Sequence, residues 1–350
     1  LEPHGQRHEQ YYQPQVSELP AEHTTTSWTA DRTVELLRAN RHRPFFLWTS
    51  FIKPHPPFDP PRGFENRHPP ETVPMPVRQE SERDPVDNHL LVQNHGKGVD
   101  DPDDNLIRLI RSRYLGSVAH IDDNVGKLMD TLEGLGLSER TVVVFMSDHG
   151  DQLGDHYAWG KRTFYLGAAR VPFLVSWPGH FPEGAARDGF VTGCDLLPTL
   201  IPLASRGARW THGEPRPFIP WPGADLAPLL RDAGAPWRDR IMGEFSSGRT
   251  FKGMLRWDDA GGSWRYAYYA NGGREQLFNL ATDPDELRDL AHAEPERCHA
   301  ARRRLVEQYR RGGYHPALDE TGDHLLAFPF QRLPLGEINN QYAVWPQHEP

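Results

Sequence analysis

The sequence contains only two cysteines, Cys194 and Cys298, among its 350 residues. This number excludes a disulfide-rich scaffold and a cysteine-rich zinc module, although it permits a single bridge. Long apolar runs are also lacking. The densest stretches, residues 44–52 and 141–146, have the length of single strands, whereas a helix that crosses a bilayer needs about 20 apolar residues. We therefore expect no membrane span.

Positive charge is scarce as well, because 39 lysines and arginines face 48 acidic residues and leave a formal net charge of -9. No basic stripe balances this excess, so we do not expect nucleic acid or an anionic membrane as the main partner. An anionic substrate would have to be held by a few local cations. Proline and glycine are abundant, with 33 and 31 residues, and predict long ordered loops, which usually serve a site.

Apolar periodicity predicts a layered α/β core in the first two thirds of the chain. Residues recurring at intervals of three and four predict helices over about 27–40 and 106–135. Nearly continuous apolar runs at 45–51, 141–146 and 172–177 predict strands covered on both faces, which is typical of a parallel sheet sandwiched by helices. The Pro-rich stretch between 59 and 103 is too long for an ordinary connection and indicates a surface excursion near a site.

The character of the sequence changes after about residue 209. Strands are expected at 241–245, 251–256 and 264–269, and a turn at Asn271-Gly272-Gly273 leads to a short strand near Leu277 and Phe278. A basic amphipathic helix follows at 296–311. We therefore predict a smaller antiparallel subdomain. The expected organisation is a polar lead-in (1–26), a partial α/β core (27–209), an antiparallel sheet with a helix (210–312), and a tail (313–350) through which the chain could form a homo-oligomer.

Asp148 and His149 directly follow the apolar run 141–146, at the end of a sheet strand where α/β proteins assemble ligand sites. A carboxylate oxygen and an imidazole nitrogen together could help to hold Ca²⁺, Mg²⁺, Mn²⁺ or Zn²⁺, and two ligands do not choose among these metals. The alternative is an aspartate that caps the next turn beside a hydrogen-bonded histidine.

Two further side chains could act on an anionic ester. His55 lies between prolines just beyond the run 45–51 and could donate a hydrogen bond or a proton to an ester oxygen. Lys161 offers a compact cation for a sulfate or phosphate oxygen, or for charge that develops on a leaving group. Taken singly, each has a simpler interpretation, as a structural or exposed histidine and as a surface lysine.

Several motifs occur together in this part of the chain. The sequence resembles the sulfatase family, in the alkaline-phosphatase superfamily. The resemblance is carried by Ser147-Asp148-His149-Gly150-Asp151-Gln152-Leu153-Gly154-Asp155-His156, Trp159-Gly160-Lys161-Arg162-Thr163-Phe164-Tyr165, Arg170-Val171-Pro172 and Trp177-Pro178-Gly179. Weaker matches bring the region covered to most of residues 27–292, including residues 44–58, Asp195-Leu196-Leu197-Pro198-Thr199-Leu200 and Asp283-Pro284-Asp285-Glu286-Leu287.

The resemblance implies a role for each candidate residue. Asp148 and His149 would be metal ligands, with Ca²⁺ the most favoured ion. His55 and Lys161 would bind the sulfate group and assist departure of the leaving group. Leu166-Gly167-Ala168 departs from the family, which usually has a glutamate or similar polar residue just after the position of Tyr165.

One family feature is absent from the sequence. Sulfatases carry, early in the chain, an aspartate pair and a Cys- or Ser-x-Pro-x-Arg motif whose first residue becomes formylglycine, and neither occurs here. Cys298 has Ala300 in place of the required proline, and Cys194 has no such context. Neither cysteine is therefore expected to be the nucleophile, and the formylglycine is expected upstream of Leu1.

The resemblance implies a metal-dependent hydrolase of small-molecule or carbohydrate sulfate esters. One alternative is a phosphonate or phosphate mono- or diester hydrolase of the same superfamily, which would use the same four residues. The other is a catalytically inactive, sulfatase-like binding module, which the missing nucleophile motif and the departure at residues 166–168 would fit.

Overall fold

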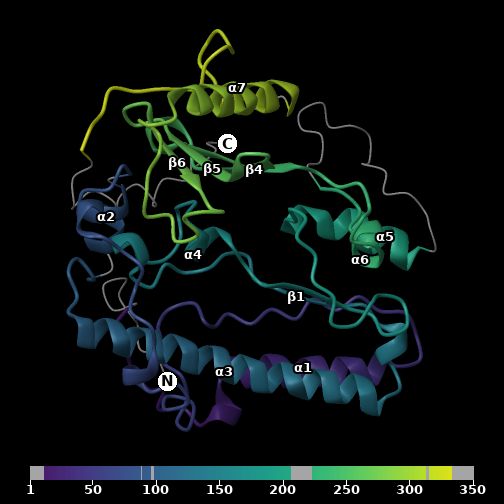
Figure 1. The fold of residues 1–350 in the computed structure, drawn as a ribbon. Coiled ribbons are helices and arrows are strands. Elements are labelled where there is room, and N and C mark those ends of the chain that lie inside the picture. Colours follow the sequence, from purple (N-terminus) through teal and green to yellow (C-terminus); the bar gives the residue numbers. More distant parts are fainter. Residues whose placement is uncertain (1–11, 88, 96–97, 206–222, 313–314, 333–350) are drawn as a thin grey trace, which may run out of the picture.

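The computed structural model describes residues 12–87, 89–95, 98–205, 223–312 and 315–332. Two long helices form one layer, a pair of strands lies next to them, and a four-stranded sheet with its own helix forms a second unit (Figure 1). Among the described residues, no helix is long and apolar enough to cross a membrane. The proposed tail contacts to a partner fall largely on residues 333–350, outside the described residues.

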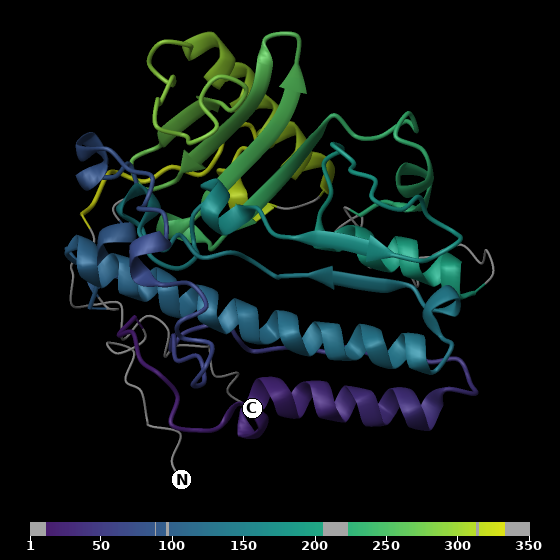
Figure 2. The same ribbon diagram turned by 60° about the horizontal axis from the view of Figure 1, so that its bottom comes forward.

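The helical layer consists of α1 (Thr25–Asn40) and α3 (Asp104–Gly134), which lie side by side in Figures 1 and 2. Each begins at an N-cap side chain: Thr24 accepts from the Ser27 amide, and Asp103 accepts from the Leu106 amide. The Ser27 hydroxyl joins the two helices through a 3.1 Å contact with His120 Nε2. Both predicted helices are confirmed, and Trp28 of the first is exposed.

Strands β1 (Val143–Met146) and β2 (Phe173–Ser176) pair in antiparallel fashion, with Val144 opposite Val175. The α/β class is confirmed, but the parallel relation expected between these two runs is wrong. A parallel crossover needs a dozen or more residues, usually an α-helix, to return the chain to the starting edge. Here the only α-helix described between them, α4 (Leu166–Ala169), has four residues, and the intervening loop stays at the end of β1 where the candidate site lies.

Residues 45–51 form no strand, contrary to prediction, although the chain is extended there. Phe45 and Leu47 pack with Val143 of β1 against the cluster of Leu37, Leu132 and Leu137. Phe46 and Trp48 point away from this cluster and are 72% and 77% exposed. The apolar and β-favouring residues therefore explain the extended conformation and the buried face of this segment. A strand also requires hydrogen bonds to the backbone of a neighbouring strand.

The C-terminal unit confirms the predicted antiparallel subdomain. Its sheet has the order β3-β4-β5-β6, and every neighbouring pair is antiparallel. Helix α7 covers one face, and a cluster that includes Leu255, Tyr266 and Leu305 fills the space between helix and sheet. The elements are β3 (Arg240–Phe245), β4 (Lys252–Asp259), β5 (Gly262–Tyr269), β6 (Arg274–Asn279) and α7 (Pro295–Gly312).

Three further short α-helices lie within the described residues. They are α2 (His89–His95), α5 (Leu196–Ala204) and α6 (Ala227–Arg231). Asp195 precedes α5, is fully buried, and pairs with Arg238 Nη2. Because Asp195 Oδ1 also accepts from the Ala224 amide at 2.8 Å, this carboxylate joins α5 to the chain that leads into the C-terminal sheet.

The other face of the C-terminal sheet carries a buried ion pair. Arg265 of β5 and Glu286 are each almost fully buried and are joined by a hydrogen bond from Arg265 Nε. The guanidinium also stacks over the rings of Tyr165 and Phe278, with its Cζ 4.9 and 4.5 Å from their centroids. Glu286 Oε2 accepts from the Leu166 amide at 2.7 Å, so the pair joins the sheet to α4.

Arg265→Met should reduce the free energy of unfolding by about 3–5 kcal/mol, because it leaves the buried Glu286 carboxylate without its cation. Denaturant titration monitored by circular dichroism measures the change. Arg310→Ala is the matched control, since its ion pair with Asp323 is more than half exposed and should contribute at most about 1 kcal/mol. Equal effects of the two substitutions would contradict a structural role for the buried pair.

Candidate active site

Asp148 and His149 lie in the loop that begins where β1 ends at Met146. The Asp148 side chain is 83% exposed, and its Oδ1 accepts from the His149 amide at 2.9 Å. Ser147 Oγ donates to the His149 carbonyl oxygen at 2.8 Å, which holds the turn between the two residues. Asp148 Oδ2 then lies 3.4 Å from His149 Nε2. The structure thus places Asp148 Oδ2 next to His149 Nε2, as the prediction of a metal-binding pair requires.

The hydrogen bonds of His149 fix the role of each ring nitrogen. Nδ1 lies 2.8 Å from the carbonyl oxygen of Gly150, which can only accept, so Nδ1 carries the proton. In the neutral ring Nε2 is therefore an acceptor with a lone pair available for a cation. Lys161 Nζ lies 2.6 Å from Nε2. The structure thus places three of the four predicted residues, Asp148, His149 and Lys161, in one cluster.

Asp151 holds the loop that carries Lys161. Its Oδ1 accepts from the amides of Leu153 and Gly160, both at 2.9 Å, and its Oδ2 accepts from the hydroxyl of Tyr12 at 2.5 Å. Burial raises the pKa of Tyr12 well above its usual value, so the hydroxyl remains a donor. The sequence placed Asp151 within the sulfatase-like motif but predicted no separate role for it. No signal in the sequence indicated that Tyr12, within the polar lead-in, would donate a hydrogen bond to its carboxylate.

The same loop contains several residues in the left-handed region of backbone space. Leu153, His156, Tyr157 and Arg162 have φ of 47°, 54°, 54° and 82°. Such values are uncommon for residues other than glycine and persist only where the surroundings hold them. His156 is held by Glu82 Oε1, 2.7 Å from its Nδ1, and by stacking on Tyr165. His156 is therefore structural, and the loop is a rigid support for Lys161.

His55 lies on the loop that follows residues 45–51. Its side chain is exposed, and its Nδ1 is 2.7 Å from the carbonyl oxygen of Pro56. Nearby, Lys53 pairs with Asp59, which holds the turn through the prolines. The role of His55 at the site stays a prediction.

Asp148 and His149 fit a divalent metal as two of its ligands. The oxygen of one and the nitrogen of the other converge, and the Gly150 carbonyl orients the imidazole as outer partners of metal-bound histidines do. Over the described ranges, no group of three or more histidine, cysteine or acidic side chains is arranged to hold a metal. The donor set is therefore partial.

The two cysteines differ in environment, and Cys298 is unsuited to be a nucleophile. It is buried in the core between α7 and the sheet, and burial raises the pKa of its thiol to about 12. Its sulfur lies 3.8 Å from the carbonyl oxygen of Ala291. At neutral pH such a thiol forms almost no thiolate, which agrees with its exclusion on sequence grounds.

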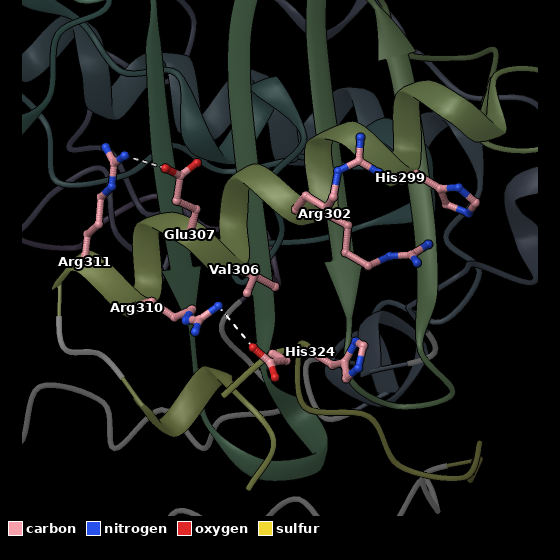
Figure 3. A pocket seen from close by; sticks show the side chains of 9 residues that line it. His299, Arg302, Val306, Glu307, Arg310, Arg311 and His324 are labelled. Atoms are coloured by element: carbon pink, nitrogen blue, oxygen red, sulfur yellow. Dashed lines mark ion pairs between the residues drawn. The ribbon is translucent and has the colours of Figure 1, made fainter. Parts of the chain in front are cut away.

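A cavity of about 700 Å³ lies away from this cluster, along the outer side of α7 (Figure 3). Basic side chains dominate its lining, yet three of its four arginines have acidic partners. Arg302 binds Glu275, Arg310 binds Asp323, and Arg311 binds Glu307. The cavity therefore carries less positive charge than its arginines suggest, and the predicted residues do not line it.

In its fold the chain is similar to the phosphonate monoester hydrolase of Agrobacterium radiobacter, with a TM-score of 0.74 over 86% of this chain and 63% of that one, at 24% identity. At this identity the likeness is one of fold, an α/β architecture shared with that hydrolase.

The sulfatase family model matches residues 4–206, which is more than half of the chain. The arylsulfatase of Clostridium perfringens is 30% identical over 298 residues, which are 83% of this chain and 59% of that protein. The choline-sulfatase of Rhizobium meliloti is 31% identical over 71% of this chain and 46% of that protein. The chain belongs to the sulfatase family, and it spans about half to three fifths of the length of these relatives.

Proposed function

We propose that the chain carries part of the active site of a metal-dependent hydrolase that cleaves sulfate esters. The observation that supports this most is the convergence of Asp148 Oδ2, His149 Nε2 and Lys161 Nζ at the end of β1. The carboxylate oxygen and the imidazole nitrogen can bind a metal cation, and the neighbouring ammonium group can bind an anionic ester. The names of the two relatives, an arylsulfatase and a choline-sulfatase, agree with a small-molecule sulfate ester as substrate, and a carbohydrate sulfate ester is the alternative.

Each residue has a separate task in this proposal. Asp148 and His149 bind the divalent cation, with Ca²⁺ favoured by the resemblance and Mn²⁺, Mg²⁺ or Zn²⁺ as alternatives. A cation bound there would polarise an ester oxygen of the substrate. The single lone pair on His149 Nε2 cannot serve both the cation and Lys161. Lys161, whose Nζ lies 2.6 Å from that nitrogen, would then donate its hydrogen bond to the departing oxygen, with His55 as a second donor.

We propose further that the nucleophile, a formylglycine, and the remaining metal ligands belong to polypeptide preceding Leu1. Two observations support this. The chain spans only 59% of the arylsulfatase that it resembles. In addition, Phe46, Trp48 and Ile52 are 69–77% exposed along one side of the extended segment, and Leu174 of β2 is 58% exposed. An apolar surface of this kind marks a contact with further protein.

Trp48 tests this part of the proposal. In the 350-residue chain alone its indole should be open to solvent, whereas in the full gene product it should be covered. Fluorine NMR of protein labelled with 5-fluorotryptophan measures solvent access at each indole, and Trp48→Phe assigns the resonance. Trp28, 63% exposed on α1, serves as an internal control. If the Trp48 indole is as accessible to solvent in the full gene product as in the 350-residue chain, the proposed contact with further polypeptide is contradicted.

The substrate class is tested by comparing two esters on the full gene product. Release of nitrophenol from a nitrophenyl sulfate and from a nitrophenyl phosphonate ester should favour the sulfate, with both rates lost on metal removal. A higher kcat/KM for the phosphonate would favour the second candidate function, which the fold similarity to a phosphonate monoester hydrolase supports. No hydrolysis of either ester, in protein shown to contain metal, would favour the inactive binding module.

A further inference from the structure

Lys252 is a buried charged residue for which the sequence predicted no role. It is the first residue of β4 and is 2% exposed. Alternation along the strand explains its direction, because the neighbouring Gly253 faces Tyr309 and Leu305 of α7. Lys252 therefore projects from the opposite face of the sheet, toward the loop that carries Lys161.

The ammonium group of Lys252 has two partners from different parts of the chain. It forms an ion pair with Asp87, whose side chain is 11% exposed, and it donates to the carbonyl oxygen of Arg162. Asp87 belongs to the long excursion between residues 59 and 103. A buried lysine remains charged only where such partners compensate its desolvation. Lys252 thus joins the C-terminal sheet, the excursion and the candidate site.

The contact with Arg162 falls on a strained point next to Lys161. Arg162 has a φ of 82°, in the left-handed region that residues other than glycine rarely adopt. On the other side of Lys161, the Gly160 amide donates to Asp151 Oδ1 and its carbonyl accepts from the Gln152 amide at 3.0 Å. Both neighbours of Lys161 are therefore fixed, one by the core of the site and one by Lys252.

We propose that Lys252 is a positioning residue, which fixes the backbone that carries Lys161 at the candidate site, through the carbonyl group of Arg162. Its action on turnover rests on the proposed ester hydrolysis, whereas its action on the loop does not. The C-terminal sheet accordingly contributes to the site without contacting the substrate.

The first test measures the loop itself, in the 350-residue chain. Hydrogen exchange followed by mass spectrometry should show amides of residues 160–165 exchanging at least about tenfold faster in Lys252→Met than in the parent. Arg302→Met is the control, because it breaks the ion pair with Glu275 on the α7 side of the same sheet. The control should leave exchange of residues 160–165 unchanged. Unchanged exchange in Lys252→Met would overturn the proposal.

Lys252→Met leaves the Asp87 carboxylate without its cation and could prevent folding, so a second variant is needed. Lys252→Met combined with Asp87→Asn removes that charge but still lacks the donor to Arg162, and it should show the same faster exchange. Lys252→Arg, which restores a cation, should return exchange toward the parent value. Slow exchange in the double variant would show that Asp87 alone determines the effect and would overturn the proposal.

The second test measures the coupling to Lys161 in the full gene product, using aryl sulfates with phenols of different acidity. Lys252→Met should lower kcat at least about tenfold for poor leaving groups and less for good ones, whereas a partly unfolded enzyme loses the same fraction for all. In a Lys161→Ala background, Lys252→Met should cause no further loss. Additive losses would overturn the proposal. If the gene product hydrolyses no ester, the proposed function fails while the exchange experiment still decides the positioning role.

Discussion

Lys161→Ala in the full gene product should lower kcat for an aryl sulfate by roughly 100-fold or more. The substitution removes the ammonium group that lies 2.6 Å from His149 Nε2 and that is expected to meet the departing oxygen. Its effect should grow as the leaving phenol becomes less acidic, because a poorer leaving group depends more on a hydrogen bond at that oxygen. KM should change much less than kcat.

Steady-state kinetics over a series of aryl sulfates checks this expectation. Lys127→Ala is the matched control, since this lysine pairs with Asp31 on the outer surface of α1 and α3. It removes the same charge and should leave kcat unchanged. If Lys161→Ala retains full turnover for the poorest leaving group, Lys161 has no part in the reaction and its contact with His149 is structural.

Asp148→Ala should abolish metal-dependent turnover, with kcat/KM reduced by about 1,000-fold or more, because it removes one of the two ligand atoms that converge at the end of β1. The Asp148 side chain is 83% exposed and supports little of the surrounding core. The fold should therefore survive the substitution. Loss of activity would then report on metal binding, and the thermal unfolding temperature should remain near that of the parent.

The metal content of the purified protein, measured by mass spectrometry, separates this effect from unfolding. Asp148→Ala should contain much less bound divalent metal than the parent at equal total concentration. Asp130→Ala, which removes an exposed carboxylate of α3, should contain as much as the parent. An Asp148→Ala protein with full metal content would remove Asp148 from the set of ligands.

Local sequence signals predicted the elements and the site cluster well. The periodicity of α3 and the turn at Asn271-Gly272-Gly273 act over a few residues, so they predicted the helix and the hairpin between β5 and β6. The juxtaposition of Asp148, His149 and Lys161 was indicated by motif spacing, because the intervening loop leaves and returns at the same end of β1.

Other features depend on contacts between distant segments and left no local signal. An apolar run such as residues 45–51 predicts a strand, but a strand forms only where a neighbouring backbone supplies hydrogen-bond partners. The antiparallel relation of β1 and β2 followed from the lack of a crossover helix, which the expected parallel sheet had assumed. Lys252 and Glu286 support the site from the C-terminal sheet, and their burial could not be inferred from sequence positions that are individually polar.

The proposed active site requires Asp148, His149 and Lys161 to act together on a cation and an anionic ester. A crystal structure of the full gene product, grown with Ca²⁺ and inorganic sulfate, tests this directly. We expect a cation coordinated by Asp148 Oδ2 and His149 Nε2, and a sulfate oxygen within hydrogen-bonding distance of Lys161 Nζ. A cation and a sulfate bound at a separate place, with Lys161 still on His149, would contradict the assignment of this cluster as the active site.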